Sequence, residues 1–366
     1  MPFNVLYPFF RWGRNRDVEL ASMGETGRAE FSTTFEEVSV AQWAACDAIV
    51  TVADLPEGCR AQLRQCRIVV TPKVGFDNFD LAAWAELGIP LCNVPDYGTQ
   101  EVADHAMALM LSLMKGITFH TRELKASPRE HWRPALNPYG RRLSACTFGI
   151  VGLGRIGTAA ALRAKAFGMD VVFYDPYLSN GVDLAIGVRR VHALDELFAT
   201  SDVVSVHAPL SPETERMIDA RVLAASKPGL ILINTARGPI VDLDALAEAL
   251  RKGQVQAAGL DVLPEEPADP EHPLIKAWAN DEDWVDHRLL ITPHSAFFTP
   301  ESAYDMRFKG GEIALTYLAG GRLQNCVNQH LLDQKAQRIG NSGQRLPGRR
   351  AQELADAAAL PRDQEN

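Results

Sequence analysis

Short apolar runs alternate with stretches of helical periodicity along most of the chain. The runs are rich in Val, Ile and Leu at successive positions, which predicts strands buried on both faces of a sheet. We expect strands at residues 4–7, 48–52, 67–70, 89–93, 147–151, 170–175, 203–207, 230–234, 256–261 and 289–291. We expect helices at 81–87, 100–114, 155–167, 243–252 and 301–319, and a further helix that ends at 62–65.

This alternation predicts an α/β protein whose parallel sheets are flanked by helices. At 366 residues the chain is too long for one ordinary core, so we expect two domains. After about residue 334 the composition is polar with little apolar pattern, which predicts a disordered tail at 334–366.

Composition and charge argue against several classes of protein. No apolar run approaches the roughly 20 residues of a membrane span, so we expect a soluble protein without a membrane partner. The first residues lack the pattern of a signal peptide, and the six cysteines contain no CxxC pair, which together favour a cytoplasmic protein without a metal site. A net charge of −9 argues against nucleic acid as a partner.

A glycine motif, Gly152-x-Gly154-x-x-Gly157, stands between the apolar run 147–151 and an alanine-rich helical stretch. In such a turn the first glycine permits the tight bend, the second lets the backbone approach a pyrophosphate, and the third lets the helix pack on the strand. The N–H groups at the helix start favour phosphate. Asp175 ends the next apolar run, where a carboxylate can bind ribose hydroxyls. The sequence therefore predicts a doubly wound Rossmann domain that binds a dinucleotide.

Two later strands are followed directly by charged residues, and ligands bind at the carboxyl ends of strands in doubly wound sheets. Arg237 lies in Asn-Thr-Ala-Arg-Gly after the run 230–234, and its guanidinium can bind a carboxylate through two hydrogen bonds. The alternative is a surface arginine in a salt bridge. Asp261 closes the next run, and Glu265 and Glu266 follow in a loop, where glutamates are usually solvated.

His294 directly follows the apolar run 289–291, whereas His272 and His287 lie in an acidic loop. A histidine at a strand end can act as an acid–base group, although a structural histidine is the alternative. Hydride transfer to a carbonyl beside a carboxylate needs one cation for orientation and one protonated acid at the oxygen. Arg237, His294 and a carboxylate that holds the imidazolium would supply that set.

Four of these blocks, in this order, resemble the signature of the D-isomer-specific 2-hydroxyacid dehydrogenases, and the resemblance covers about residues 48–330. They are Gly152-Leu-Gly-Arg-Ile-Gly157, Asn234-Thr-Ala-Arg-Gly238, Asp261 through Glu266-Pro267, and Pro293-His294. The resemblance implies an NAD-dependent oxidoreductase that interconverts a small 2-oxo acid and a D-2-hydroxy acid.

The resemblance also implies a role for each matching residue. Arg237 would bind the substrate, His294 would be the acid–base residue, and Glu266 rather than Glu265 would pair with it. The implied NAD site comprises Gly152, Gly154, Arg155, Ile156, Gly157, Asp175, His207, Pro209, Thr235, Ala236 and Asp261. Within it, Asp261 would hold the nicotinamide carboxamide, and Asp175 would favour NAD over NADP. The implied substrate-binding residues are Val74, Gly75 and Phe297.

In this family the chain crosses twice between its domains. The resemblance implies a substrate domain of residues 1–115 and 295–333 and an NAD-binding Rossmann domain of residues 116–294. A homodimer built on the nucleotide domain is also implied.

Within the family, Gly-Phe-Asp-Asn and Leu-Gln-Asn-Cys-Val-Asn328 are similar to the C-terminal-binding proteins, and Pro293-His-Ser-Ala-Phe-Phe298 is similar to D-lactate dehydrogenases. Two features depart from the family pattern: Lys73 stands where a small residue is common, and the loop 268–286 is long and acidic. Two functions therefore remain, a 2-oxo acid reductase and an NAD(H)-sensing regulatory protein of the C-terminal-binding-protein type with weak turnover.

Overall fold

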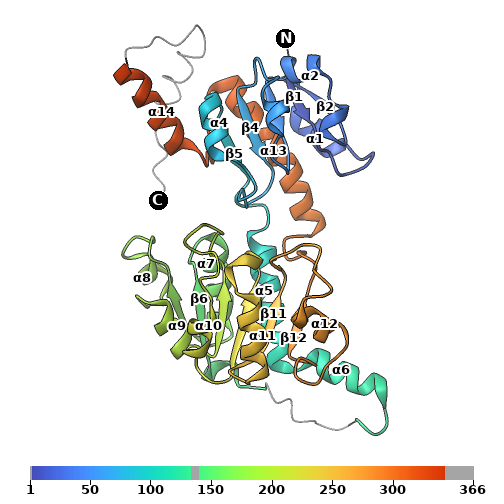
Figure 1. Ribbon diagram of the computed structural model, residues 1–366, viewed down its shortest axis with the longest axis vertical. Coiled ribbons are helices and arrows are strands. Elements are labelled where there is room, and N and C mark those ends of the chain that lie inside the picture. The colour runs from blue at the N-terminus through green and yellow to red at the C-terminus, as the bar shows by residue number, and fades with distance from the viewer. Residues whose placement is uncertain (1, 133–139, 343–366) are drawn as a thin grey trace. The chain divides into compact units, whose positions relative to one another are not determined.

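The computed structural model describes residues 2–132 and 140–342 (Figure 1). The chain forms two compact units: unit 1 is Met1–Gly98 with Thr299–Asn366, and unit 2 is Thr99–Phe298. Each unit is an α/β structure built on one parallel sheet, as the sequence predicts. None of the helices in the described ranges is both long and apolar enough to span a membrane.

Unit 1 contains a five-stranded sheet in the order β2-β1-β3-β4-β5, with every neighbouring pair parallel. The strands are β1 (Phe3–Tyr7), β2 (Gly27–Phe31), β3 (Ala48–Val50), β4 (Ile68–Thr71) and β5 (Leu91–Asn93). Four of them were predicted. The sequence pattern misses β2 because this edge strand is only partly buried and carries Arg28 and Glu30 among its five residues.

The helices of unit 1 come from both ends of the chain. They are α1 (Asp17–Met23), α2 (Val40–Ala45), α3 (Glu57–Arg60), α4 (Leu81–Leu87), α13 (Pro300–Gly320) and α14 (Gln329–Ser342), with a 3-10 turn at Phe35–Glu37. The helix predicted to end at 62–65 is wrong in its position, since α3 ends at Arg60 and Leu63 is a buried loop residue. Helix α13 packs on α1 and on strands β3 and β4.

A buried ion pair holds α13 against α1. Arg307 donates to both carboxylate oxygens of Glu19, at 2.7 and 2.6 Å, and the two side chains are 8% and 2% exposed. Gly311 allows this close packing, because a Cβ there would lie 2.2 Å from Ser22 Oγ. The two ends of the chain therefore share one core.

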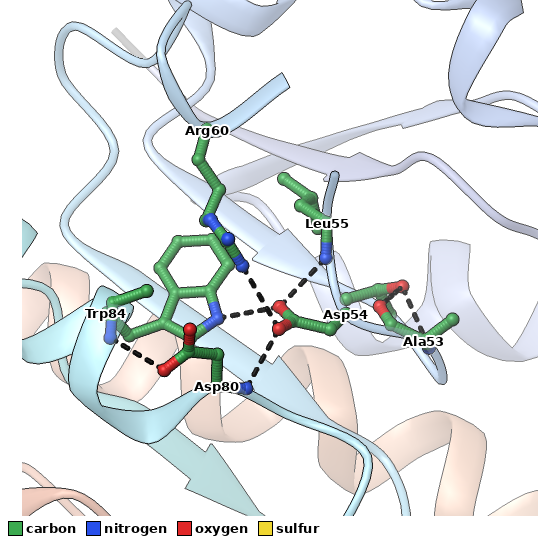
Figure 2. A network of polar contacts seen from close by, with 8 residues as sticks. Ala53, Asp54, Leu55, Arg60, Asp80 and Trp84 are labelled. Atoms are coloured by element: carbon green, nitrogen blue, oxygen red, sulfur yellow. Dashed lines mark hydrogen bonds and ion pairs between the residues drawn. The ribbon is translucent and has the colours of Figure 1, made fainter. Parts of the chain in front are cut away.

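The Asp54 carboxylate joins the loops that follow β3 and precede α4 (Figure 2). It accepts hydrogen bonds from the Leu55 and Asp80 backbone N–H groups and from Trp84 Nε1, each at 2.8 Å, and from Arg60 at 3.1 Å. Four donors satisfy its lone pairs, so the group is fixed in place. This network fixes the loops at the carboxyl end of the unit 1 sheet.

The structure corrects the prediction of a disordered tail from residue 334. Helix α14 extends to Ser342 and packs on α4, where Lys335 donates to the Glu86 carbonyl. Asn328 anchors its start, accepting from Leu91 N–H at 2.9 Å and donating to the Ile89 carbonyl at 3.1 Å. The rest of the predicted tail, 343–366, lies outside the described residues.

Unit 2 contains a seven-stranded parallel sheet in the order β12-β11-β10-β9-β6-β7-β8. The strands are β6 (Thr147–Val151), β7 (Asp170–Tyr174), β8 (Arg189–Arg190), β9 (Val203–Val206), β10 (Leu230–Asn234), β11 (Val255–Leu260) and β12 (Leu289–Ile291). Only β8, a two-residue edge strand of arginines, has no apolar run to predict it.

The helices of unit 2 cover both faces of this sheet (Figure 1). They are α5 (Thr99–Lys115), α6 (Ile117–Ala126), α7 (Arg155–Ala166), α8 (Val182–Ile186), α9 (Leu194–Thr200), α10 (Ala220–Ala224), α11 (Leu243–Arg251) and α12 (Pro273–Ala279), with 3-10 turns at Leu143–Ala145 and Gly238–Ile240. Alternate residues of one strand enter separate cores: Ile231 and Ile233 join the cluster beside α5 and α7, and Leu230 and Leu232 join the other.

Three expectations for this unit need correction. The predicted boundary near residue 115 is too late, because α5 packs on α7, β10 and β11, with Gly259 leaving space for Leu109 of the helix. The second boundary falls after Phe298 instead of 294. The acidic segment 268–286 is not a plain loop either, since α12 within it buries Leu274 and Ile275.

Candidate functional site

The order of strands in unit 2 reverses at its centre. After β6 the chain adds β7 and β8 on one side, and then returns to β9, β10, β11 and β12 on the other. In such sheets ligands bind beyond the carboxyl ends of the two central strands. The glycine motif follows β6 and His207 follows β9, so the predicted nucleotide residues lie at this switch point.

The three glycines have distinct environments in the turn between β6 and α7. Gly152 has φ +88°, and a Cβ there would lie 2.9 Å from the Ala208 backbone. A Cβ on Gly157 would lie 2.1 Å from the Gly152 carbonyl oxygen, so only glycine lets the helix approach the turn. A Cβ on Gly154 would meet nothing within 4 Å. This arrangement fits a pyrophosphate at the start of α7, where Arg155 and Ile156 begin the helix.

Asp175, directly after β7, is tied to the glycine turn. One carboxylate oxygen accepts from Leu153 N–H at 3.0 Å, and the other accepts from Tyr177 and Leu178 N–H at 3.0 and 3.1 Å. Arg190 donates to the Asp175 backbone carbonyl at 3.3 Å. Asp175 therefore lies beside the turn, where a carboxylate that binds ribose hydroxyls is expected. Its hydrogen bond to Leu153 also stabilises the turn.

Buried polar atoms lie on the other side of the switch point. Burial lowers the pKa of His207 to about 4, so the imidazole is neutral near pH 7. Its Nε2 lies 2.9 Å from Ser205 Oγ, whereas its Nδ1 has no hydrogen-bond partner among the described residues. Within the same described ranges, the buried Thr235 Oγ1 also has none. Polar groups that are buried without partners are consistent with a bound ligand, and the donor set fits a nicotinamide dinucleotide. Pro209 lies in the loop after His207, and Ala236 follows Thr235.

Arg237 is positioned by the turn after β10. The Asn234 side chain donates to the Arg237 carbonyl at 2.9 Å and accepts from the Ala236 N–H at 3.0 Å. Gly238 then lies against the loop after β11, since a Cβ there would be 1.9 Å from the Leu263 carbonyl carbon. The half-buried guanidinium is therefore brought to the loop that carries Glu266, whose pKa it helps to lower.

Glu266 and His294 form a close pair. Glu266 Oε2 lies 2.6 Å from His294 Nδ1, and its Oε1 accepts from Leu263 N–H at 3.1 Å. Partial burial acts to raise the pKa of Glu266, but the hydrogen bonds from His294 and Leu263 and the charges of His294 and Arg237 lower it overall. The side chains of His294 and Glu266 are 41% and 38% exposed, so the imidazole can still reach a ligand. The predicted contact is thus made by Glu266.

Asp261 organises the loop that carries His294. Its carboxylate, 2% exposed, accepts from Thr292 Oγ1 at 2.6 Å and from the N–H groups of Ser295 and Ala296 at 2.9 and 3.0 Å. His105 of α5 in turn lies 2.9 Å from Thr292 Oγ1. A carboxylate has about four acceptor positions, and these three hydrogen bonds occupy three of them.

Three residues that hold this loop, His105, Thr292 and Ser295, are not predicted by the sequence pattern. The available signal was weak: His105 is a polar residue on the apolar helix α5, and Thr292 follows β12 directly. Phe297, named from the resemblance, lies edge-on to His294 with 6.1 Å between ring centroids.

Val74 and Gly75 belong to unit 1, in the loop after β4. Asn93 donates to the Val74 carbonyl at 2.7 Å, and Val94 N–H donates to the Lys73 carbonyl at 3.2 Å. The Lys73 ammonium donates to Asn78 Oδ1 at 3.1 Å and lies 5.9 Å from the centroid of the Phe79 ring. The loop is therefore held in a defined conformation.

The histidines of the acidic segment have structural contacts. His272 caps α12, accepting from Leu274 N–H at 3.2 Å, and lies 3.3 Å from Asp244. His287 pairs with Asp286 at 3.2 Å and packs edge-on to Phe119. In residues 2–132 and 140–342, no group of three or more His, Cys, Asp or Glu side chains is placed to hold a metal ion.

The sequence profile of the D-isomer specific 2-hydroxyacid dehydrogenase NAD-binding domain matches residues 107–296. The chain belongs to this family. It is an oxidoreductase with the family's NAD-binding domain, and the match covers the sheet that carries the site.

Two relatives show the similarity in sequence. A glyoxylate reductase of Korarchaeum cryptofilum is 34% identical over 294 residues, which is 78% of this chain and 84% of that protein. A D-3-phosphoglycerate dehydrogenase of Mycobacterium leprae is 37% identical over 262 residues, 72% of this chain but 47% of that longer protein.

A solved structure shows the similarity in fold. The D-lactate dehydrogenase from Aquifex aeolicus, complexed with NAD and lactic acid, aligns with a TM-score of 0.70 at 28% sequence identity. The alignment covers 87% of this chain and 96% of that one.

Proposed function

We propose that this dehydrogenase interconverts a 2-oxo acid and a D-2-hydroxy acid, with His294 as the acid–base residue. The observation that carries the proposal is the 2.6 Å contact between His294 Nδ1 and Glu266, which leaves the opposite ring nitrogen for a substrate. The sequence relatives support the substrate class, since one is a glyoxylate reductase and another a phosphoglycerate dehydrogenase.

Each residue has a separate task in the proposed reaction. When bound, a nicotinamide cofactor would supply the hydride for the carbonyl carbon, or would accept one in the reverse direction. His294 gives its Nε2 proton to the carbonyl oxygen as the C–H bond forms, and takes it back from the hydroxyl on oxidation. Glu266 holds the imidazole by its other nitrogen and stabilises the imidazolium. Arg237 orients the substrate carboxylate through two parallel hydrogen bonds.

The cofactor site has proposed roles as well. The backbone at Gly152, Gly154 and Gly157 would bind the pyrophosphate, and Asp175 the adenosine ribose. Asp261 would use its remaining acceptor position for the carboxamide. The other cofactor residues named from the resemblance, and the substrate roles of Val74, Gly75 and Phe297, stay predictions.

Steady-state assays with NADH and a panel of glyoxylate, pyruvate and other 2-oxo acids test the proposal. We expect turnover of at least one acid to a D-2-hydroxy acid, and loss of most turnover in His294→Ala with NADH binding retained. His330→Ala, an exposed position on α14, is the matched control. The alternative, an NAD(H)-sensing regulatory protein, predicts tight NADH binding with negligible turnover of the whole panel.

We also propose a homodimer built on unit 2. The proposal follows from the resemblance to the family, since the apolar side chains of α5 are already buried against α7, β10 and β11 of the same unit. Light scattering of the intact chain should give twice the mass of 40.2 kDa, and a mass of one chain would contradict the proposal.

A further inference from the structure

The loop that carries His294 is held by hydrogen bonds that begin on α5. His105 Nε2 lies 2.9 Å from Thr292 Oγ1, and Thr292 Oγ1 lies 2.6 Å from Asp261 Oδ1. The same carboxylate accepts from the N–H groups of the two residues after His294, at 2.9 and 3.0 Å. The series therefore runs from a helix through a strand end to the loop of the proposed acid–base residue.

The direction of each hydrogen bond follows from the groups involved. A carboxylate only accepts, so at 2.6 Å the single hydroxyl proton of Thr292 is donated to Asp261. The hydroxyl oxygen must then accept from His105, whose Nε2 carries the proton. His105 Nε2 also lies 3.6 Å from Asp261 Oδ1, so its N–H dipole or charge faces the carboxylate.

His294 needs this support because its backbone is unusual. Its φ of +52° is in the left-handed region, which non-glycine residues occupy only when their surroundings hold them there. His294 N–H donates to the Asp261 and Thr292 carbonyls, at 2.8 and 3.0 Å. Asp261 and Thr292 thus restrain the loop with both backbone and side chain.

We propose that His105 is a positioning residue for the reaction: through Thr292 and Asp261 it fixes the loop that presents the His294 imidazole to Glu266. His105 itself touches no reacting atom. The inference rests on the proposed function, because it assigns His105 to the site in which His294 transfers the proton.

Paired variants of the intact chain test the inference. Thr292→Val removes the hydroxyl at nearly constant shape, and His105→Leu removes the donor. We expect each to lower kcat about tenfold, because small misplacement of a reacting group is costly, while the KM for the 2-oxo acid and the Kd for NADH change little. Thr292→Ser keeps a hydroxyl and His105→Gln keeps an N–H donor, so both variants should have a kcat near that of the wild type. Asp104→Asn, at an exposed neighbouring position on α5, is the control.

The double variant His105→Leu/Thr292→Val shows whether the two residues act through one series of hydrogen bonds or independently. Since both changes break the same hydrogen bond, the double variant should be no slower than the slower single variant. Multiplied losses, or a lower melting temperature with unchanged kcat, would overturn the inference and leave His105 a purely structural residue.

A measurement without substrate distinguishes this inference from the proposed function. In ¹⁵N-histidine NMR spectra, the His294 Nδ1–H signal is assigned by its change in Glu266→Gln. It should shift in Thr292→Val and return in Thr292→Ser. If that response occurs but no 2-oxo acid is turned over, the proposed function fails and the positioning role stands. If the wild type turns over a 2-oxo acid but neither the signal nor kcat responds, the positioning role fails alone.

Discussion

Glu266 and His294 are 28 positions apart in the chain, yet two of their side-chain atoms lie within 2.6 Å. We expect Glu266→Gln to weaken reduction at neutral pH, because the imidazolium loses its negative partner. Measurements of kcat/KM in both directions check this, and Glu265→Gln should leave the values near those of the wild type.

The lowered pKa of Glu266 also predicts that the contribution of this residue to stability depends on pH. A carboxylate with a lowered folded-state pKa stabilises the fold fully above its unfolded pKa, and this contribution is lost as pH falls through the folded-state value. The difference in melting temperature between the wild type and Glu266→Gln should therefore shrink at acidic pH. A difference that is independent of pH would show that the pair is not ionic.

Arg237 is expected to act on the substrate. Arg237→Lys should lower kcat/KM by about one to two orders of magnitude, because lysine cannot form the two parallel hydrogen bonds. The Kd for NADH should stay within error. Arg221→Lys, an exposed arginine of α10, serves as the control. An equal loss of NADH affinity would place Arg237 in the cofactor site or in the fold.

Asp175 is expected to set the preference between cofactors. Its carboxylate would repel a 2′-phosphate, so the protein should use NADH much better than NADPH. Because Asp175 also accepts from Leu153 N–H, Asp175→Asn should narrow the preference for NADH over NADPH and also weaken NADH binding. Kinetics with both cofactors check this, and equal use by the wild type would contradict it.

At the scale of the element, different glycines of the turn between β6 and α7 serve packing and ligand binding. Gly157→Ala would place a Cβ 2.1 Å from the Gly152 carbonyl oxygen, and such overpacking costs about 1–3 kcal/mol or more. Gly154→Ala meets nothing within 4 Å, so it should keep the melting temperature and yet weaken NADH binding. Thermal melts and NADH titrations of both variants would show whether the two roles are separate.

The strands of both units were largely predictable because strands buried on both faces leave continuous apolar runs in the sequence. The exceptions have physical causes. Edge strands such as β2 and β8 have a solvent-exposed side and carry charges, so their patterns resemble loops. Helix α12 has only seven residues and lies between acidic stretches, so its apolar positions span too few turns to show a helical period.

At the scale of the whole molecule, unit 1 depends on contacts between the two ends of the chain. Arg307→Ala would leave Glu19 buried without its partner, which typically costs about 3–5 kcal/mol. Arg307→Met combined with Glu19→Leu should be less destabilising than Arg307→Ala, since an apolar pair removes both charges. Chemical denaturation monitored by circular dichroism would check this order, and the reverse order would contradict it.

The sequence by itself determined the α/β class, the strand–turn–helix with its glycines, and the order of the four signature blocks. These features are local, since backbone freedom, apolar runs and neighbouring residue types are readable within a few positions. It also singled out Arg237, Glu266 and His294 as candidates, because each follows a strand and matches a block of the family. The roles of these three residues stay predictions.

Only the tertiary structure decided which compact unit contains α5 and which residues surround the His294 loop. The apolar residues of α5 could cover either sheet, so its sequence does not say on which sheet the helix packs. His105 and Thr292 are 187 positions apart, and no local pattern predicts their hydrogen bond. Contacts of this kind arise where separate elements meet, and they depend on the packing of the whole unit.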